Sequence, residues 1–292
     1  MRLLPLTLLL FAVACGSSSS REEYDNNSHT STTRYGWDGE LYGDIETIVE
    51  QGYDVKNRLH GEELIPSYCQ TIKFNALGDV DEIFLDNDSD NIIDSNIKYY
   101  YDEQNHLTHY VNHYKDGERV YTTQCETDAR GNITLYAHYD NHSISQYGSK
   151  YLYNSNDKPI EISHYDKSGE LSSKELITYH NNGELYRCVE YNAEGELKSE
   201  FITTLNNRGK IVKIRLLKYD DKGDISSIQE QDLEYNKQNQ LIRLLRIDKL
   251  EREETERTME YDAKGNVVKI NRYESEARIL NEVIERNITY RN

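Results

Sequence analysis

The sequence YDAKGNVVKINRY at residues 261–273 contains the unit from which most of this chain is built. Tyr261 is followed by a polar turn, Gly265 stands four residues after it, and the apolar Val267 comes two residues later. A run of strand-forming residues then ends at Tyr273. A tight turn containing glycine, between two stretches rich in tyrosine and β-branched residues, predicts a β-hairpin.

The same unit recurs along the chain with a period close to 26 residues. We call the residue before each turn the anchor, and successive anchors are 27, 26, 26, 26, 26, 30, 26 and 29 residues apart. Spacing this regular indicates a repeat architecture. The anchors are Phe74, Tyr101, Thr127, Tyr153, Tyr179, Leu205, Tyr235, Tyr261 and Tyr290.

The fourth residue after each of the first eight anchors is of a type that tolerates a positive φ angle. A hairpin built on a type I turn needs such a residue to close it. A second, looser turn follows in each period, so one repeat contains two strands of about nine residues, or about 30 Å each. The predicted left-handed residues are Gly78, Asn105, Gly131, Asp157, Gly183, Gly209, Asn239 and Gly265.

Apolar side chains occupy most anchors and most positions two before them, as at Tyr261 and Met259. This alternation is typical of a strand with one covered face. A further apolar column, which includes Ile83, Ile162 and Ile270, lies nine residues after the anchors and has the opposite parity. Either both faces are partly covered there or a β-bulge shifts the phase in each hairpin, and the sequence leaves both explanations open.

These patterns predict an all-β fold, a long antiparallel β-meander of about seventeen strands that forms a twisted or coiled open sheet. The chain has 25 Tyr but only four Phe and one Trp, and its mean hydropathy is −0.86. A thin repeat sheet explains this composition, because a tyrosine ring can pack while its hydroxyl reaches water. A transmembrane barrel is the rival architecture, but Lys and Arg occupy both faces of the strand at residues 210–219 and leave no lipid-facing band.

Residues 1–14 have the features of a signal peptide: one Arg, an apolar run too short to span a membrane, and small residues at the end. Cys15, followed by Gly16 and a run of serines, resembles a bacterial lipoprotein box and predicts lipidation of Cys15. The sequence Ala12–Val13–Ala14 also fits ordinary signal cleavage, which would give a soluble secreted protein. We expect residues 15–35 to form a flexible Ser/Thr-rich tether and residues 36–292 a single β-repeat domain.

The chain is acidic, with 52 Asp and Glu residues against 34 Lys and Arg residues. Removal of residues 1–14 takes away Arg2 and no acid, so the mature chain has 33 basic residues and a net charge of −19. This charge argues against nucleic acid and anionic membrane surfaces as partners.

Few residues suggest chemistry. Cys69 and Cys125 stand two repeats apart, which corresponds to about 19 Å in a flat meander. A disulfide requires Cα atoms within about 7 Å, so we expect none between them. His113, His138 and His164 each precede a tyrosine, but equivalent positions lie about 9.6 Å apart, too far to share a metal ion. No Gly-rich phosphate loop, HExxH, CxxC or nucleophile–base constellation stands out. We therefore expect no catalytic activity and no cofactor beyond weak calcium binding.

The calcium prediction concerns residues 86–94, DNDSDNIID, which place carboxylates at Asp86, Asp88, Asp90 and Asp94. The pattern resembles calcium loops of the DxDxDG type. The bidentate Glu of an EF-hand is missing, because position 12 is Ile97, so any calcium site would be weak. The alternative interpretation is an acidic turn of the first repeat.

Together, the FNALGD turn at residues 74–79 and the Tyr–Asp–x–x–Gly units resemble the YD- or RHS-like repeat lipoproteins of Gram-negative bacteria, over about residues 40–290. The resemblance implies a lipoprotein of the cell envelope, at the outer membrane, held there by its lipid anchor. We expect a non-catalytic binding or scaffold module for a glycan or an envelope protein. An immunity or toxin-associated RHS-like protein is the alternative, and a hydrolase is a third and less favoured one.

If Cys15 is lipidated, the protein should partition into the detergent phase of a Triton X-114 extraction, because an acyl chain adds about 0.8 kcal/mol of membrane affinity per buried CH₂. Cys15→Ser should move the protein into the aqueous phase. Equal partitioning of both forms would contradict the lipoprotein interpretation.

Overall fold

A computed structural model describes residues 41–58, 61–117, 120–139, 145–274 and 277–291. The predicted signal peptide, Cys15 and the tether therefore lie outside the described residues. The described chain forms eighteen strands of 7 to 14 residues. They are β1 (Ile45–Arg58), β2 (Gly61–Phe74), β3 (Val80–Asp86), β4 (Ser95–Tyr101), β5 (Leu107–Tyr114), β6 (Val120–Thr127), β7 (Ile133–Tyr139), β8 (Ser145–Tyr153), β9 (Pro159–Tyr165), β10 (Leu171–Tyr179), β11 (Leu185–Asn192), β12 (Leu197–Leu205), β13 (Ile211–Tyr219), β14 (Ile225–Tyr235), β15 (Leu241–Asp248), β16 (Glu254–Tyr261), β17 (Val267–Glu274) and β18 (Ile279–Tyr290).

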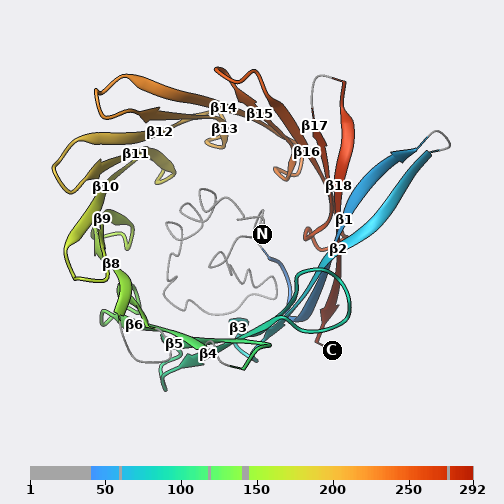
Figure 1. Cartoon of the computed structure of the whole chain (residues 1–292), viewed down its shortest axis with the longest axis horizontal. Helices are drawn as coiled ribbons and strands as arrows, with labels where there is room; N and C mark the ends of the chain where they lie inside the picture. The colour runs from blue at the N-terminus through green and yellow to red at the C-terminus, as the bar shows by residue number, and fades with distance from the viewer. Residues whose placement is uncertain (1–40, 59–60, 118–119, 140–144, 275–276, 292) are drawn as a thin grey trace.

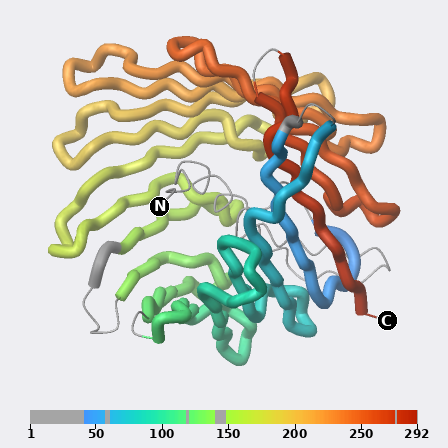
Figure 2. Tube along the Cα trace, turned by 45° about the vertical axis from the view of Figure 1, so that its right-hand side comes forward, coloured from blue at the N-terminus to red at the C-terminus, as the bar shows by residue number. Residues whose placement is uncertain are grey.

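Every strand pairs antiparallel with its sequence neighbours, and β1 pairs with both β2 and β18. The sheet therefore closes into a barrel of 18 strands, seen as a ring in Figure 1. Figure 2 shows the first and last strands, coloured blue and red, running side by side at the closure. The all-β antiparallel meander is confirmed, whereas the predicted open sheet is wrong. The edges are paired because β1 and β18 satisfy each other's backbone groups.

The residue after the anchor caps the turn. In the hairpin at Tyr261, the Asp262 carboxylate accepts the backbone N–H of Lys264 at 2.9 Å and that of Asn266 at 2.8 Å. Gly265 has a φ of +98°, a conformation that costs little only for glycine. All eight residues predicted to be left-handed have a positive φ. The Tyr–Asp–x–x–Gly spacing is thus a consequence of turn geometry.

One extra residue in each anchor hairpin sets the phase of its second strand. Tyr261 pairs with Val267, but Met259 pairs with Ile270, so a bulge lies between these two pairs. The same register shift occurs at the seven other anchor hairpins. The two apolar columns of opposite parity therefore share one face, and of the two explanations left open the bulge is correct.

The anchor tyrosines join neighbouring repeats. The Tyr261 hydroxyl donates to the carbonyl of Leu241, the first residue of a strand in the preceding repeat, at 2.6 Å. The ring packs against other apolar groups while the hydroxyl satisfies a backbone acceptor, which explains the preference for tyrosine over phenylalanine. Equivalent bonds of 2.6–2.8 Å run from Tyr101 to Val80, Tyr153 to Ile133, Tyr179 to Pro159 and Tyr235 to Ile211.

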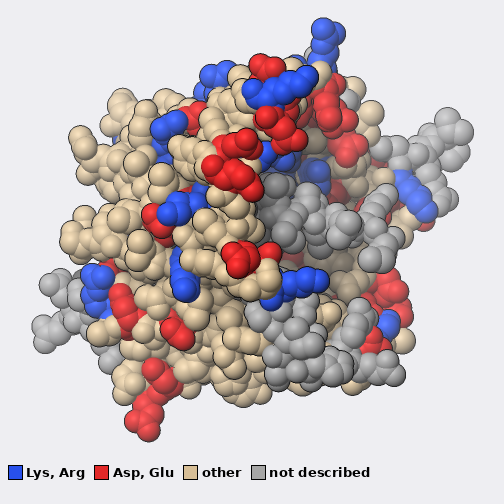
Figure 3. Space-filling view, turned by 60° about the vertical axis from the view of Figure 1, so that its left-hand side comes forward, with Lys and Arg blue, Asp and Glu red and all other residues tan. Residues whose placement is uncertain are grey.

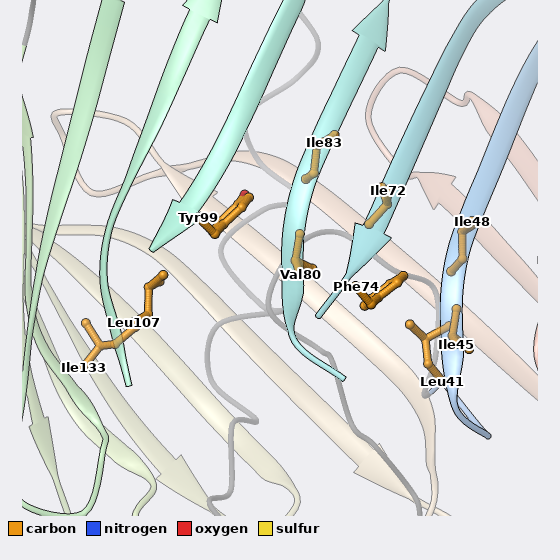
Figure 4. Close-up of a cluster of buried hydrophobic side chains, with 10 residues drawn as sticks. All are labelled: Leu41, Ile45, Ile48, Ile72, Phe74, Val80, Ile83, Tyr99, Leu107 and Ile133. Carbon is orange, nitrogen blue, oxygen red and sulfur yellow. The ribbon is translucent and has the colours of Figure 1, made fainter. Parts of the chain in front are cut away.

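The shared apolar face lines the inside of the barrel, which we call the lumen. The blue beginning of the described chain lies on the inner side of the ring (Figure 1), and Leu41 there belongs to the largest buried cluster. Figure 4 shows this cluster spreading from β1 across the neighbouring strands to β7. Its members are Leu41, Ile45, Ile48, Ile72, Phe74, Val80, Ile83, Tyr99, Leu107 and Ile133.

A buried ion pair joins the strands at the closure. Arg286 Nε on β18 donates to Glu50 Oε2 on β1 at 2.7 Å, and each side chain is only 7% exposed. The other carboxylate oxygen of Glu50 accepts the Tyr68 hydroxyl at 2.8 Å and the Gln70 amide at 2.9 Å, both from β2. One carboxylate thus connects three strands, and its charge is fully hydrogen-bonded, as a buried charge requires.

Asn266 fixes the entry of the chain to the same region. Its side chain, fully buried, accepts the Tyr42 N–H at 2.6 Å and donates to the Tyr42 carbonyl at 2.8 Å and to the Tyr290 hydroxyl at 2.7 Å. A single amide therefore holds the segment before β1 against the turn after β16 and the end of β18.

The outer wall is charged. Cross-strand ion pairs lie on it, and Figure 3 shows acidic and basic side chains interspersed over one face. Charges of this kind are costly in contact with lipid. Among the described residues, no helix has the length and apolarity to cross a membrane. The pairs include Lys73–Glu82, Lys174–Glu161, Lys213–Glu230, Arg243–Glu234 and Lys269–Glu285.

Arg286→Met should lower the free energy of unfolding by about 3–5 kcal/mol, because it leaves the Glu50 carboxylate buried without its partner. Lys269→Met is the matched control, since it removes a cation from an exposed ion pair on the neighbouring strand and should cost at most about 1 kcal/mol. Urea unfolding followed by circular dichroism measures both. Equal midpoints for the two variants would show that the buried pair does not hold the closure.

Candidate functional site

A hollow of about 490 Å³ lies on the outer wall over β5, β6 and β7. The hollow forms where outward-facing side chains on adjacent strands are small. Gln124 pairs with Ala137, and Ala137 pairs with Gly148. A Cβ at Gly148 would lie 2.8 Å from the Tyr136 carbonyl oxygen, so only glycine fits this close approach. The lining residues are Thr108, His109, Val111, Thr122, Gln124, Cys125, Glu126, Leu135, Ala137 and Tyr139.

An aromatic stack stands at one side of this hollow. The His109 ring lies 4.4 Å from the Tyr100 ring at an interplanar angle of 4°, and Tyr100 is 41% exposed. Thr108 Oγ1 is 3.0 Å from His109 Nδ1 and fixes the orientation of the imidazole. The amide of Gln124 and the carboxylate of Glu126 provide hydrogen-bonding groups on the same wall. A flat ring surface beside polar groups can accept a molecule with one apolar face and several hydroxyls.

The acidic loop between β3 and β4 brings together three of its four predicted carboxylates. Ligand oxygens of Asp86, Asp88 and Asp94 lie within 4.8 Å of one another. Asp90 is not part of this group; its Oδ1 accepts the Ile92 N–H at 2.8 Å. The predicted calcium site is therefore only partly assembled.

Protein groups already occupy much of this acidic cluster. Asp86 accepts the backbone N–H groups of Asp90 and Asn91 at 3.1 and 2.8 Å. Asp94 forms an ion pair with Lys115 from the turn after β5 and accepts the Asn87 N–H at 2.8 Å. The hydrogen bond from Lys115 lowers the pKa of the Asp94 carboxyl. The ammonium group of Lys115 thus balances part of the negative charge of the loop. In a calcium loop the metal ion balances that charge.

The three histidines that precede tyrosines do not form one column. His113 is exposed and lies on the outer wall, whereas His138 and His164 face the lumen, because β5 has one more residue before its tyrosine. Burial lowers the pKa of His138 to about 4. Cys69, Cys125 and Cys188 form no disulfide within the described residues, and of these three only Cys188 is buried.

The lumen also holds a line of polar side chains that the sequence did not reveal. Ser149 Oγ is 2.9 Å from His164 Nδ1, and His164 Nε2 is 3.0 Å from Glu175 Oε1. The sequence pattern alone did not single out these three residues. The signal that could have found them is the repeat register: once the bulge is placed, these three positions fall on one face of adjacent strands.

No protein-family profile matches this chain, and no curated protein matches it. Among solved structures, it is similar to a porin-like protein from Bacteroides uniformis, with 11% identity, a TM-score of 0.46, and coverage of 84% of this chain and 98% of that one. A porin-like protein from Bacteroides vulgatus has 8% identity, a TM-score of 0.34, and coverage of 82% and 97%. The TcdB2-TccC3-Cdc42 complex has 11% identity and a TM-score of 0.31 over 83% of this chain but only 16% of that one. With TM-scores below 0.5, none of these similarities carries an argument about this protein.

Lys115→Met should increase the response of the acidic loop to calcium. Removal of the ammonium frees an oxygen of Asp94 for a hard cation, and a site of this kind is expected to bind with a Kd of about 10⁻⁴–10⁻³ M. Millimolar calcium should then raise the Tm of the variant more than that of the wild type, by mass action. Asp88→Ala in the same background is the control and should abolish the difference. An equal calcium response of wild type and Lys115→Met would reduce the loop to an acidic turn.

Proposed function

We propose that this chain is a binding or scaffold module of the cell envelope, tethered through a lipid on Cys15, whose outer wall binds a glycan. The observation that carries the proposal is the hollow over β5–β7, with the Tyr100–His109 stack at its side. The proposed location is the outer membrane of a Gram-negative bacterium, with the membrane contacted only through the anchor. Residues 15–35 would then serve as the spacer between the bilayer and the barrel.

The chemistry of the hollow favours a sugar over a purely apolar ligand. The C–H face of a pyranose packs on an aromatic ring, while its hydroxyls bond to amide and carboxylate groups such as Gln124 and Glu126. The net charge of −18 disfavours polyanionic glycans, because they would be repelled at long range. Neutral sugars and amino sugars are therefore the favoured ligands. An envelope protein is the other partner that such a wall could accept.

The second candidate function, an immunity or toxin-associated protein, is favoured by the Tyr–Asp–x–x–Gly units alone. Those units are explained by turn geometry, since the Asp caps the turn and the Gly closes it. They therefore support a repeat architecture more directly than a toxin partnership. Co-purification with a toxin encoded beside this chain would favour the second candidate over the first.

A glycan array probed with residues 16–292 should show binding to neutral or amino sugars, with His109→Ala weakening it by about tenfold or more, as loss of a central aromatic contact does. Isothermal titration with a sugar from the array gives the Kd. The expected loss has a physical reason: the substitution removes the ring that lines the hollow and leaves Tyr100 without its stacking partner.

Tyr186→Ala is the matched control. Tyr186 is 44% exposed and contacts His180 at 4.8 Å between ring centroids, so it is a similar aromatic pair on the same barrel but outside the hollow. It should leave the Kd unchanged. Binding that is weakened equally by both substitutions, or absent for every sugar, would overturn the assignment of the hollow.

A further inference from the structure

The lumen wall at β8, β9 and β10 carries a serine, a histidine and a glutamate in hydrogen-bonded sequence. Ser149 on β8 lies directly opposite His164 on β9, with Oγ to Nδ1 at 2.9 Å. Glu175 on β10 pairs with Ile162, one pleat from His164, which places its Oε1 at 3.0 Å from Nε2. Three neighbouring strands thus align one side chain each along the sheet.

The burial of these groups differs in a way that suits proton transfer. The Glu175 side chain is 7% exposed, whereas that of His164 is 23% exposed and Ser149 is half-buried. A carboxylate in this position holds a proton on Nε2, so that the Nδ1 lone pair faces the Ser149 hydroxyl. In the usual serine hydrolase arrangement Nε2 faces the serine and Nδ1 faces the acid, whereas here Nδ1 faces the serine and Nε2 faces the acid. Either nitrogen of a neutral imidazole can act as the base.

Cys188 fixes the other oxygen of the carboxylate. Its Sγ donates to Glu175 Oε2 at 3.3 Å, and burial raises the pKa of the thiol, so it remains a neutral donor. Glu175 is therefore held at both oxygens, by a thiol on one side and an imidazole on the other. The carboxylate that orients His164 is thus itself held in position, as an oriented base requires.

The set occurs at one place in the repeat pattern. One period earlier, the positions of Ser149, His164 and Glu175 are occupied by Thr123, His138 and Ser149. Thr123 Oγ1 and His138 Nδ1 are 2.7 Å apart, so the hydroxyl–imidazole pair recurs, but the carboxylate position is a serine. One period later, the three positions hold Glu175, Glu190 and Phe201, with no imidazole.

We propose that Ser149 is the nucleophile of a Ser–His–Glu site that hydrolyses small carboxylic esters. Ser149 Oγ attacks the ester carbonyl carbon while its proton passes to His164 Nδ1. The C–O bond to the alcohol breaks, and the alcohol leaves with that proton. Water then adds to the acyl group on Ser149, its proton returns through His164 to Oγ, and the carboxylic acid is released.

Tyr151 is the candidate group for stabilising the oxyanion. It follows Ser149 by two positions on the same face of β8. A phenol is protonated at neutral pH and can donate, and burial raises the pKa of Tyr151 further. A tyrosine hydroxyl can serve in place of backbone N–H groups at such a site. This activity departs from the expectation of a non-catalytic protein and does not depend on the glycan proposal.

An alkyl fluorophosphonate tests the site directly. Ser149 Oγ would form a bond to phosphorus while the P–F bond breaks and fluoride leaves. The resulting O–P bond is stable, so the labelled protein can be detected. Wild-type protein should gain one label, mapped by peptide mass spectrometry to Ser149, and should release nitrophenol from 4-nitrophenyl acetate. Ser149→Ala should lose both. A wild type that takes no label, or takes it at another residue, overturns the proposal.

Three further variants separate catalysis from structure. Ser173→Ala removes a hydroxyl from the residue paired with His164 on β10 and should label as the wild type does. Glu175→Gln should slow labelling about tenfold or more without a comparable fall in Tm, since it weakens the base but keeps the shape. His164→Ala should lose labelling, and added imidazole should restore it. Failure of imidazole to restore labelling in a folded His164→Ala variant would assign the line a structural role only.

Discussion

The extra residue in each anchor hairpin is the feature on which the rest of the barrel depends. Side chains alternate between the two faces of a strand, so a turn without the bulge would send every apolar residue of the next strand to the wrong side. The bulge between the Tyr261–Val267 and Met259–Ile270 pairs corrects the phase, and it recurs at all eight anchor hairpins. A common apolar inner face follows from that correction.

The inner face carries both apolar and polar groups. Its apolar clusters surround Ile48, Ile177 and Ile270. Its polar groups include the Glu50–Arg286 pair at the closure and the Ser149–His164 pair several strands away. A polar group on the lumen wall must find a partner on a neighbouring strand, because little water is available to a buried side chain. Hydrogen-bonded lines across strands are the result.

The repeat fixes where each side chain lies on the sheet, and differences in residue type between repeats create the candidate sites. Lumen positions that hold Thr123 and His138 in one repeat hold Ser149 and His164 in the next, and there the following strand contributes Glu175. On the outer wall, Ala137 and Gly148 replace larger side chains and leave a hollow beside an aromatic stack. Both candidate sites therefore arise where one repeat departs from its neighbours on a frame that stays constant.

The repeat, the turn type and the all-β class can all be predicted from the amino-acid sequence alone. The Asp after an anchor and the left-handed residue at Gly265 or Asn105 act within a few residues of the chain, so their effect can be predicted without knowing the rest of the fold. The same locality explains the acidic loop: Asp86, Asp88 and Asp94 were found because they are neighbours in sequence. The ion pair of Asp94 with Lys115 was not, because Lys115 comes from the next hairpin.

The closure of the sheet, the face that lies inside and the contacts between distant side chains depend on the folded structure. Closure is the sum of the twist and curvature of eighteen strands, and it brings together Glu50 and Arg286 from opposite ends of the described chain. The face of each second strand depended on the bulge, for which the repeat left two explanations open. Ser149, His164 and Glu175 became one line only when strand register placed them side by side, because pairing between strands, and not sequence distance, sets which side chains touch.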